Sequence, residues 1–152
     1  VLGRVHHLVP GEEGMELLAD SAGVQANGVA LDTEGRYLFF TFDRTIRRLD
    51  LTDGTQIEVA IPDGEGAGTD GLYLYQGSLV AVQPRRNRVV RLELNQAMDA
   101  VMSATVVAAD HPDFAYPTTG VVVGDTLYLV ATSFADRPRI EGSGPQHPDV
   151  VI

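Results

Sequence analysis

A polar residue followed by glycine opens three similar stretches of this chain. The polar residues are Asn27, Asp70 and Thr119, which are 43 and 49 residues apart, and each stretch continues as a short apolar strand, a tight turn and a second strand. In the first stretch the turn runs from Asp32 to Gly35. There the aspartate can hydrogen-bond its own backbone and the glycine accepts a positive φ, so the pattern indicates a β-hairpin. A hairpin that returns at this spacing limits the chain to a few repeat architectures.

A second repeat follows the hairpins. The segments RVHHLV, TIRRLDL and RVVRLEL align on Val5, Ile46 and Val89, at intervals of 41 and 43 residues. A period of about 40–50 residues with four short strands per unit is typical of a β-propeller. Helical solenoids have similar periods, but they need apolar residues at three-and-four spacing, and here apolar residues alternate or form short runs bounded by Gly, Asp and Pro. The sequence therefore predicts an all-β propeller of four-stranded antiparallel blades.

The chain divides into about three blades. We expect a blade remnant at 1–22, blades at 23–62 and 66–110, and a partial blade at 116–152. Strands are expected at 3–9, 15–20, 28–31, 37–42, 45–51, 56–61, 71–75, 79–83, 88–94, 105–109, 120–123 and 127–132, with a short helical turn within 95–104. The tract 137–148 is rich in Pro and Gly and leads to a strand-like end at 150–152.

Three blades are too few to close a ring. About four to eight blades are needed, and an open stack leaves strand edges that aggregate. The chain also begins with Val1 and carries no leader pattern. We therefore expect the C-terminal half of a larger propeller, in which the missing half or a second copy of the chain completes the ring.

Composition narrows the classes of partner. A net charge of −10 argues against nucleic acid or an anionic membrane as the main partner. No apolar run approaches the ~18 residues of a membrane span. Cysteine is absent, and no serine lies in a nucleophile-elbow context, so covalent acyl chemistry has no support. A small-molecule substrate is the expected partner.

The three polar residues that open the repeats are candidate metal ligands. Residues that open successive innermost strands point toward the propeller axis on one face, so Asn27, Asp70 and Thr119 are expected to converge. Their amide, carboxylate and hydroxyl oxygens suit Ca²⁺ or Mg²⁺. The glycine after each one lets the backbone pass close to the neighbouring blade. In the alternative interpretation, Asn-Gly and Asp-Gly only form turns at the strand entries.

The runs ANGVALDTEGRYLFF, TDGLYLYQGSLVAVQ and YPTTGVVVGDTLYLVATS resemble the calcium-dependent lactonase propellers. These are the group of senescence marker protein, gluconolactonase and luciferin-regenerating enzyme, with strictosidine synthase-like and NHL-type propellers as relatives. The resemblance covers most of 24–135 and implies a six-bladed ring with a divalent cation, Ca²⁺, in its central channel. It implies Asn27 and Asp70 as metal ligands and Asp70 as the general base or water activator. A Glu and a second Asn complete the family's site and have no counterpart in this chain, and Thr119 departs from the pattern.

Loops at the channel mouth supply candidate substrate-binding residues. Loops before the inner strands and after the second strands share one propeller face, which would gather Asp43, Arg44, Arg85, Arg86, His111 and Asp113. As paired donors, Arg85 and Arg86 could bind a substrate carboxylate or phosphate. His111 could serve in acid–base chemistry. The alternative is that all of these are solvated or structural loop residues.

Two classes of function follow. In the first, the protein is a metal-dependent hydrolase of lactones or other esters, in which the ion polarises the carbonyl and activates water. In the second, it is a non-catalytic propeller, NHL-like or strictosidine synthase-like, that binds a partner at its channel mouth. A divalent ion in the channel would distinguish them.

Overall fold

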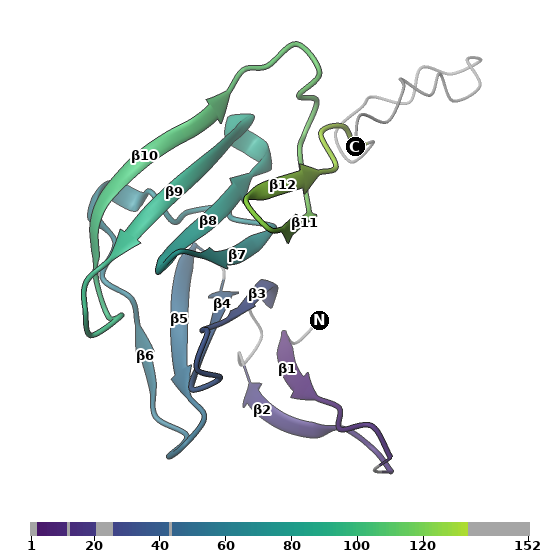
Figure 1. Cartoon of the computed structure of the whole chain (residues 1–152), viewed down its shortest axis with the longest axis vertical. Helices are drawn as coiled ribbons and strands as arrows, with labels where there is room; N and C mark the ends of the chain where they lie inside the picture. The colour runs from purple at the N-terminus through teal and green to yellow at the C-terminus, as the bar shows by residue number, and fades with distance from the viewer. Residues whose placement is uncertain (1–2, 12, 21–25, 43, 134–152) are drawn as a thin grey trace.

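The structure is a computed structural model that describes residues 3–11, 13–20, 26–42 and 44–133 (Figure 1). Within these residues the chain forms twelve strands and two 3₁₀ helices, and it contains no α-helix. The strands are β1 (Arg4–His7), β2 (Glu16–Asp20), β3 (Ala26–Leu31), β4 (Tyr37–Phe42), β5 (Thr45–Asp50), β6 (Gln56–Glu58), β7 (Leu72–Tyr75), β8 (Ser78–Gln83), β9 (Arg88–Leu94), β10 (Val101–Ala109), β11 (Gly120–Val123) and β12 (Thr126–Leu129). The 3₁₀ helices are η1 (Pro62–Gly64) and η2 (Pro84–Arg86). Neither of these short helices is suited to span a membrane.

The strands form four separate sheets. Two are four-stranded antiparallel meanders, β3-β4-β5-β6 and β7-β8-β9-β10, and two are hairpins, β1-β2 and β11-β12. The sheets follow one another in an arc in which β3 lies beside β7 and β7 beside β11 (Figure 1). The segments of the second repeat are β1, β5 and β9, and the last two are the third strands of their sheets. The prediction of an all-β fold with four-stranded antiparallel units is confirmed.

The second strand of each four-stranded sheet is apolar on both sides. In β4, Phe39 points into one cluster of buried side chains, while Leu38 and Phe40 point into another. In β8, Leu79 points into the same cluster as Phe39, while Val80 points into a third cluster on the opposite face. Because successive side chains of a strand point to opposite faces, each sheet packs against a neighbour on both faces, as expected of a blade.

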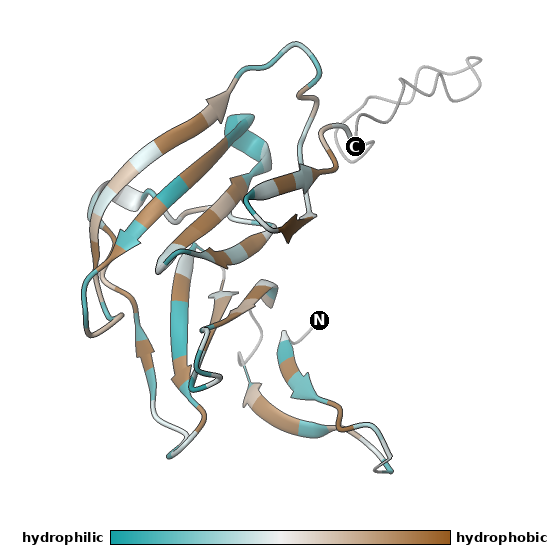
Figure 2. Cartoon of the chain, in the orientation of Figure 1, coloured by the Kyte–Doolittle hydropathy of each residue, from teal (hydrophilic) through white to brown (hydrophobic). Residues whose placement is uncertain are grey.

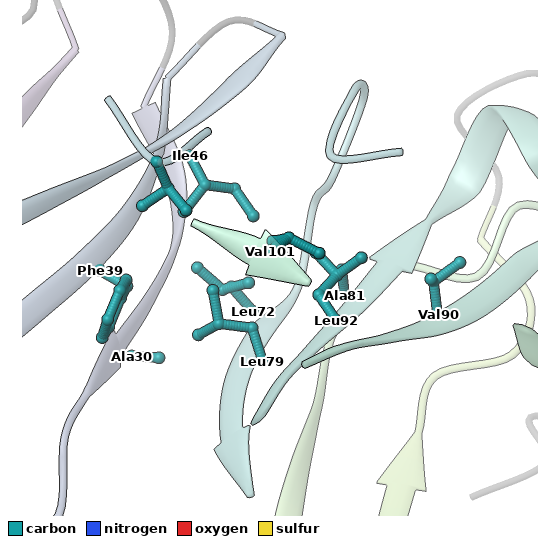
Figure 3. Close-up of a cluster of buried hydrophobic side chains, with 10 residues drawn as sticks. Ala30, Phe39, Ile46, Leu72, Leu79, Ala81, Val90, Leu92 and Val101 are labelled. Carbon is teal, nitrogen blue, oxygen red and sulfur yellow. The ribbon is translucent and has the colours of Figure 1, made fainter. Parts of the chain in front are cut away.

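The largest cluster lies between the two four-stranded sheets (Figure 3). Its members are Ala30, Phe39, Ile46 and Val59 from one side and Leu72, Leu79, Ala81, Val90, Leu92 and Val101 from the other. The third strand is more mixed, and hydrophobic and hydrophilic segments alternate along β9 (Figure 2). Complete burial of a side chain of Leu or Phe size contributes about 1.5–3 kcal/mol, so this cluster is the main source of stability between the sheets.

Two of the opening glycines lie where consecutive sheets come closest. A Cβ added at Gly28 would lie 2.6 Å from the backbone nitrogen of Leu72, and one at Gly71 would lie 2.8 Å from the carbonyl oxygen of Thr118. These distances leave no room for a side chain. The glycine requirement that the sequence suggested therefore comes from close backbone approach between neighbouring sheets.

The predicted helical turn at 95–104 is wrong. The side-chain oxygen of Asn95 accepts hydrogen bonds from the backbone N–H groups of Asp99 and Ala100, and Met98 adopts a positive φ of 53°. This closes a tight turn, after which β10 begins at Val101, four residues before the predicted start.

Strand β6 is also shorter than predicted. It ends at Glu58 because the chain then crosses to the next sheet, where Ala60 forms a parallel bridge with Ala100. The tract 137–148 and the end at 150–152 lie outside the described residues, and the blade boundaries and the number of blades in a complete ring stay predictions.

Candidate functional site

A cavity of about 600 Å³ lies where the two four-stranded sheets open. Its wall comes from the start of β3, the end of β4 and the turn after it, the loop 67–70 before β7, and the segment from the end of β8 through η2. Tyr116, from the loop that precedes β11, completes it. Residues far apart in the sequence therefore share one cavity.

Asn27 and Asp70 both line this cavity. The Asn27 side chain lies next to the Asp70 carboxylate in the cavity wall, and the backbone N–H of Asn27 donates to Thr41 Oγ1 at 3.1 Å. Partial burial raises the pKa of Asp70, and the neighbouring Asn27 amide opposes that rise by stabilising the charged form. The structure thus brings together the two residues for which the sequence predicted a shared site.

Thr119 is not brought to the same place. Its Oγ1 lies 3.1 Å from the Tyr73 hydroxyl, which also accepts a hydrogen bond from the Gly120 N–H at 2.5 Å. Neither Thr119 nor its neighbour Thr118 lines the cavity.

The hydrogen-bond ladder shows, in addition, that the third opening is offset by one residue from the sequence alignment. Asp70 N–H donates to the Val82 carbonyl, and Thr118 N–H donates to the Val130 carbonyl in the corresponding position. The reverse bonds run from Val82 to Gly71 and from Val130 to Thr119. By this register Thr118, not Thr119, is the structural counterpart of Asp70, and the sequence offered only the ambiguous pair in YPTTG.

Three arginines line the cavity: Arg44 from the turn after β4, and Arg85 and Arg86 from η2. Arg86 Nη1 is 3.9 Å from Glu65 Oε2, which also pairs with Arg88 at 2.5 Å. In the part of the chain that the structure describes, Arg44 and Arg85 have no ion-pair partner. The predicted gathering of Arg44, Arg85 and Arg86 is thus seen in the structure, and among the described residues Asp70 is the one carboxylate in the lining.

His111 lies elsewhere. Its Nδ1 is 3.5 Å from Asp113 Oδ2, and its ring lies 5.7 Å from the ring of Phe114. The pair lines a separate hollow of about 330 Å³ beside β10 and β12. The structure therefore does not bring His111 or Asp113 into the cavity that holds the arginines, and Asp43 lies outside the described residues.

The sequence did not single out Tyr116, Thr41 or Gln83. Tyr116 reaches the cavity because its backbone N–H donates to Asn87 Oδ1 at 3.2 Å, a contact between distant loops that local sequence does not encode. Gln83 is almost fully buried, donates to the Glu65 carbonyl and accepts from Arg88 Nε at 2.7 Å. A polar residue near the end of an apolar strand was the available signal for Thr41 and Gln83.

Asn27 and Asp70 fit part of a divalent-cation site. An amide and a carboxylate are hard oxygen donors, but Ca²⁺ takes six to eight oxygens. Within the described residues no group of three His, Cys, Asp or Glu side chains is placed to hold a metal. Asn27 and Asp70 therefore fit as two ligands, and further oxygens would come from backbone, water or residues beyond those described.

No family model matches the chain, and no curated protein matches it. Solved structures do. A luciferin-regenerating enzyme matches with a TM-score of 0.64 at 14% identity, covering 88% of this chain and 46% of the other. Virginiamycin B lyase from Staphylococcus aureus matches with 0.58 at 19% identity (85% and 42% covered). The PQQ-bound aldose sugar dehydrogenase from Streptomyces coelicolor matches with 0.56 at 17% identity (88% and 45% covered).

These likenesses define the class of fold. The chain has a β-propeller fold, and it spans less than half the length of each of these solved structures. They include several enzymes, among them a luciferin-regenerating enzyme, a lyase and a dehydrogenase. At identities below 20% the likeness extends to the fold and not to one activity.

Proposed function

We propose that the protein is a metal-dependent hydrolase of lactones or related esters, with Ca²⁺ as the expected ion and Asn27 and Asp70 among its ligands. The observation that supports this most is the contact between these two side chains, 43 residues apart, in the wall of one cavity. Both occupy the position before an opening glycine, which matches the ligand positions of the calcium-dependent lactonase propellers. When bound, such an ion polarises a substrate carbonyl and makes a water molecule more acidic.

The protein's own groups supply the proton transfer. Asp70 lies in the cavity wall, where a carboxylate oxygen that does not bind the ion can accept the proton of an attacking water. The Asn27 amide lies beside this carboxylate, and Thr41 fixes the backbone of Asn27.

The test is a calorimetric titration of Ca²⁺ together with hydrolysis assays on a panel of lactones and esters, using the purified protein. We expect Asp70→Asn to weaken Ca²⁺ binding at least about tenfold, because it removes the one carboxylate that lines the cavity. It should lower hydrolysis more than Asn27→Ala does, since Asp70 also serves as the base. Asp53→Asn, in an exposed turn, is the charge-matched control and should change neither quantity.

Two results would contradict the proposal: no Ca²⁺ binding by the unmodified protein, or binding that both cavity variants leave unchanged. The melting temperature should stay close to that of the unmodified protein, because neither side chain belongs to a hydrophobic cluster between the sheets.

The second candidate is a non-catalytic binding module. The observation that favours it is the charge of the cavity, where three arginines face one carboxylate and oppose a cation. Ligand binding in the cavity without Ca²⁺ binding and without ester hydrolysis would support this alternative.

A further inference from the structure

The cavity differs in charge from the chain as a whole. The protein carries a net charge of −10, yet the cavity lining contains three arginines and one aspartate. The chain has no lysine, so apart from its four histidines every basic side chain is a guanidinium, whose charge stays fixed across the working pH range. The cavity is therefore a positive region within an acidic protein.

Two of the three arginines have no carboxylate partner among the residues that the structure describes. Arg86 shares Glu65 with Arg88, so part of its charge is neutralised. No carboxylate among the described residues pairs with Arg44 or Arg85, and both are exposed on the cavity wall. They come from different sheets, Arg44 from the turn between β4 and β5 and Arg85 from η2 after β8.

The segment that carries Arg85 is held in place. Pro84 begins η2, and Asn87 ends it in a left-handed conformation, φ 44° and ψ 47°. The Asn87 side chain accepts a hydrogen bond from the Tyr116 N–H, and the Asn87 carbonyl accepts one from Asp110 N–H. On either side of η2 in the sequence, Arg88 Nε donates a hydrogen bond to Gln83 Oε1 at 2.7 Å. A guanidinium on a fixed segment is preorganised for a ligand, which lowers the entropic cost of binding.

We propose that Arg44 and Arg85 form an oxyanion-binding site that holds a carboxylate or phosphate group of the substrate. Each guanidinium can donate two parallel hydrogen bonds to such a group. A substrate held there places its neutral remainder toward Asp70 in the same cavity, so the substrate class is an anionic lactone or ester. Describing the ligand as a substrate rests on the proposed hydrolase function, whereas anion binding itself does not.

The experiment measures the binding of inorganic phosphate and of malonate by calorimetry, in buffer freed of divalent metal and at low ionic strength. We expect Arg44→Gln and Arg85→Gln each to weaken binding about tenfold, because each removes a charged hydrogen-bond donor, and the double variant to lose measurable binding. Arg85→Lys should recover only part of the affinity, since an ammonium cannot donate the two parallel bonds. Whichever probe binds more tightly identifies the recognised group as phosphate or carboxylate.

Two further variants sharpen the test. Arg86→Gln should have a smaller effect than Arg85→Gln, because Glu65 already neutralises part of the Arg86 charge. Arg4→Gln removes one positive charge from β1, outside the cavity, and should change nothing. Failure of both probes to bind, or equal binding by the double variant and the unmodified protein, would overturn the inference.

The two proposals fail separately. If the protein binds the anions through Arg44 and Arg85 but neither binds Ca²⁺ nor hydrolyses esters, the anion site stands and the hydrolase is excluded. If Ca²⁺ binding and hydrolysis depend on Asp70, but the affinity for phosphate and malonate is unchanged when both arginines are replaced, the hydrolase stands and the anion site is wrong.

Discussion

Two of the layers between successive sheets are held together in different ways. The first layer, between β3–β6 and β7–β10, is a continuous apolar cluster in which Phe39, Ile46 and Leu79 are fully buried. The second layer, between β7–β10 and the hairpin β11-β12, has a smaller buried cluster of Val80, Val82 and Val89. Tyrosine hydroxyls supplement it with hydrogen bonds between the sheets.

The number of facing strands accounts for this difference. The four-stranded sheet β3–β6 is wide enough to cover its neighbour as far as the outer strand β10. Val101 at the start of β10 is therefore buried in the first layer. The two strands of β11-β12 cover less, and Val107 on β10, which lines a hollow beside Val122 and Leu127, stays 62% exposed. Stability between the sheets should therefore be concentrated in the first layer, since it follows the apolar area removed from water.

Truncating Phe39 gives the largest expected effect. Phe39→Ala leaves a cavity in the centre of the first layer and should lower the free energy of unfolding by about 3–5 kcal/mol. Leu127→Ala, at a partly buried side chain that packs on the cluster of the second layer, should cost clearly less, because less apolar area is removed from the layer. Chemical denaturation of both variants measures the contrast. Equal losses would show that the layers do not differ as described.

Adding one methyl group to the first layer is the next test. In Gly28→Ala the new Cβ would lie 2.6 Å from the Leu72 nitrogen, so the two sheets must move apart. We expect a loss of about 1–3 kcal/mol, the usual cost of overpacking. Val29→Ala, at the next position of β3 where the side chain is 48% exposed, is the control and should cost much less. Thermal unfolding that ranks Val29→Ala above Gly28→Ala would contradict the close approach of the sheets.

The sequence predicted the strands better than the turns that join them. Strand periodicity and the 43-residue step between Asn27 and Asp70 are local or repeated signals, and they placed β4, β9 and β11 with the bounds that the structure has. The same signals weaken where the repeat changes length. The turn at 95–104 has a single i→i+3 backbone bond, from Met98 to Asn95, and is otherwise closed by the Asn95 side chain and by Asn95 N–H bonding to Ala100, which residue pattern alone did not distinguish from a helical turn.

In the candidate site, too, the residues at repeated positions were predicted and those placed by distant contacts were not. Asn27 and Asp70 share a wall because they occupy equivalent repeat positions, whereas Thr119 was aligned one residue out of register with the hydrogen-bond ladder. Tyr116 reaches the cavity through a contact with Asn87, 29 residues away, that no periodic signal encodes. Whether these residues bind metal or substrate stays a prediction until the titrations are made.

The smallest expected effect belongs to the second layer. The Tyr75 hydroxyl donates to Asp125 Oδ1 at 2.7 Å and so joins β7–β10 to the hairpin β11-β12. Tyr75→Phe removes this bond but keeps the ring, and it should lower the melting temperature by less than about 4 °C at neutral pH. Tyr128→Phe, at a tyrosine of the same hairpin that is 44% exposed, is the matched control and should leave the melting temperature unchanged.

The pH dependence separates this bond from ordinary packing. The hydrogen bond to Asp125 raises the pKa of Tyr75 above its ordinary value, because it stabilises the protonated phenol beside a negative charge. A raised folded-state pKa means that the contribution to stability is complete below about pH 10 and is lost as the pH rises through the raised pKa. The melting temperatures of Tyr75→Phe and the unmodified protein should therefore converge in alkaline solution. A constant difference across that range would show that the hydroxyl contributes through packing and that the second layer, like the first, is held by apolar contact.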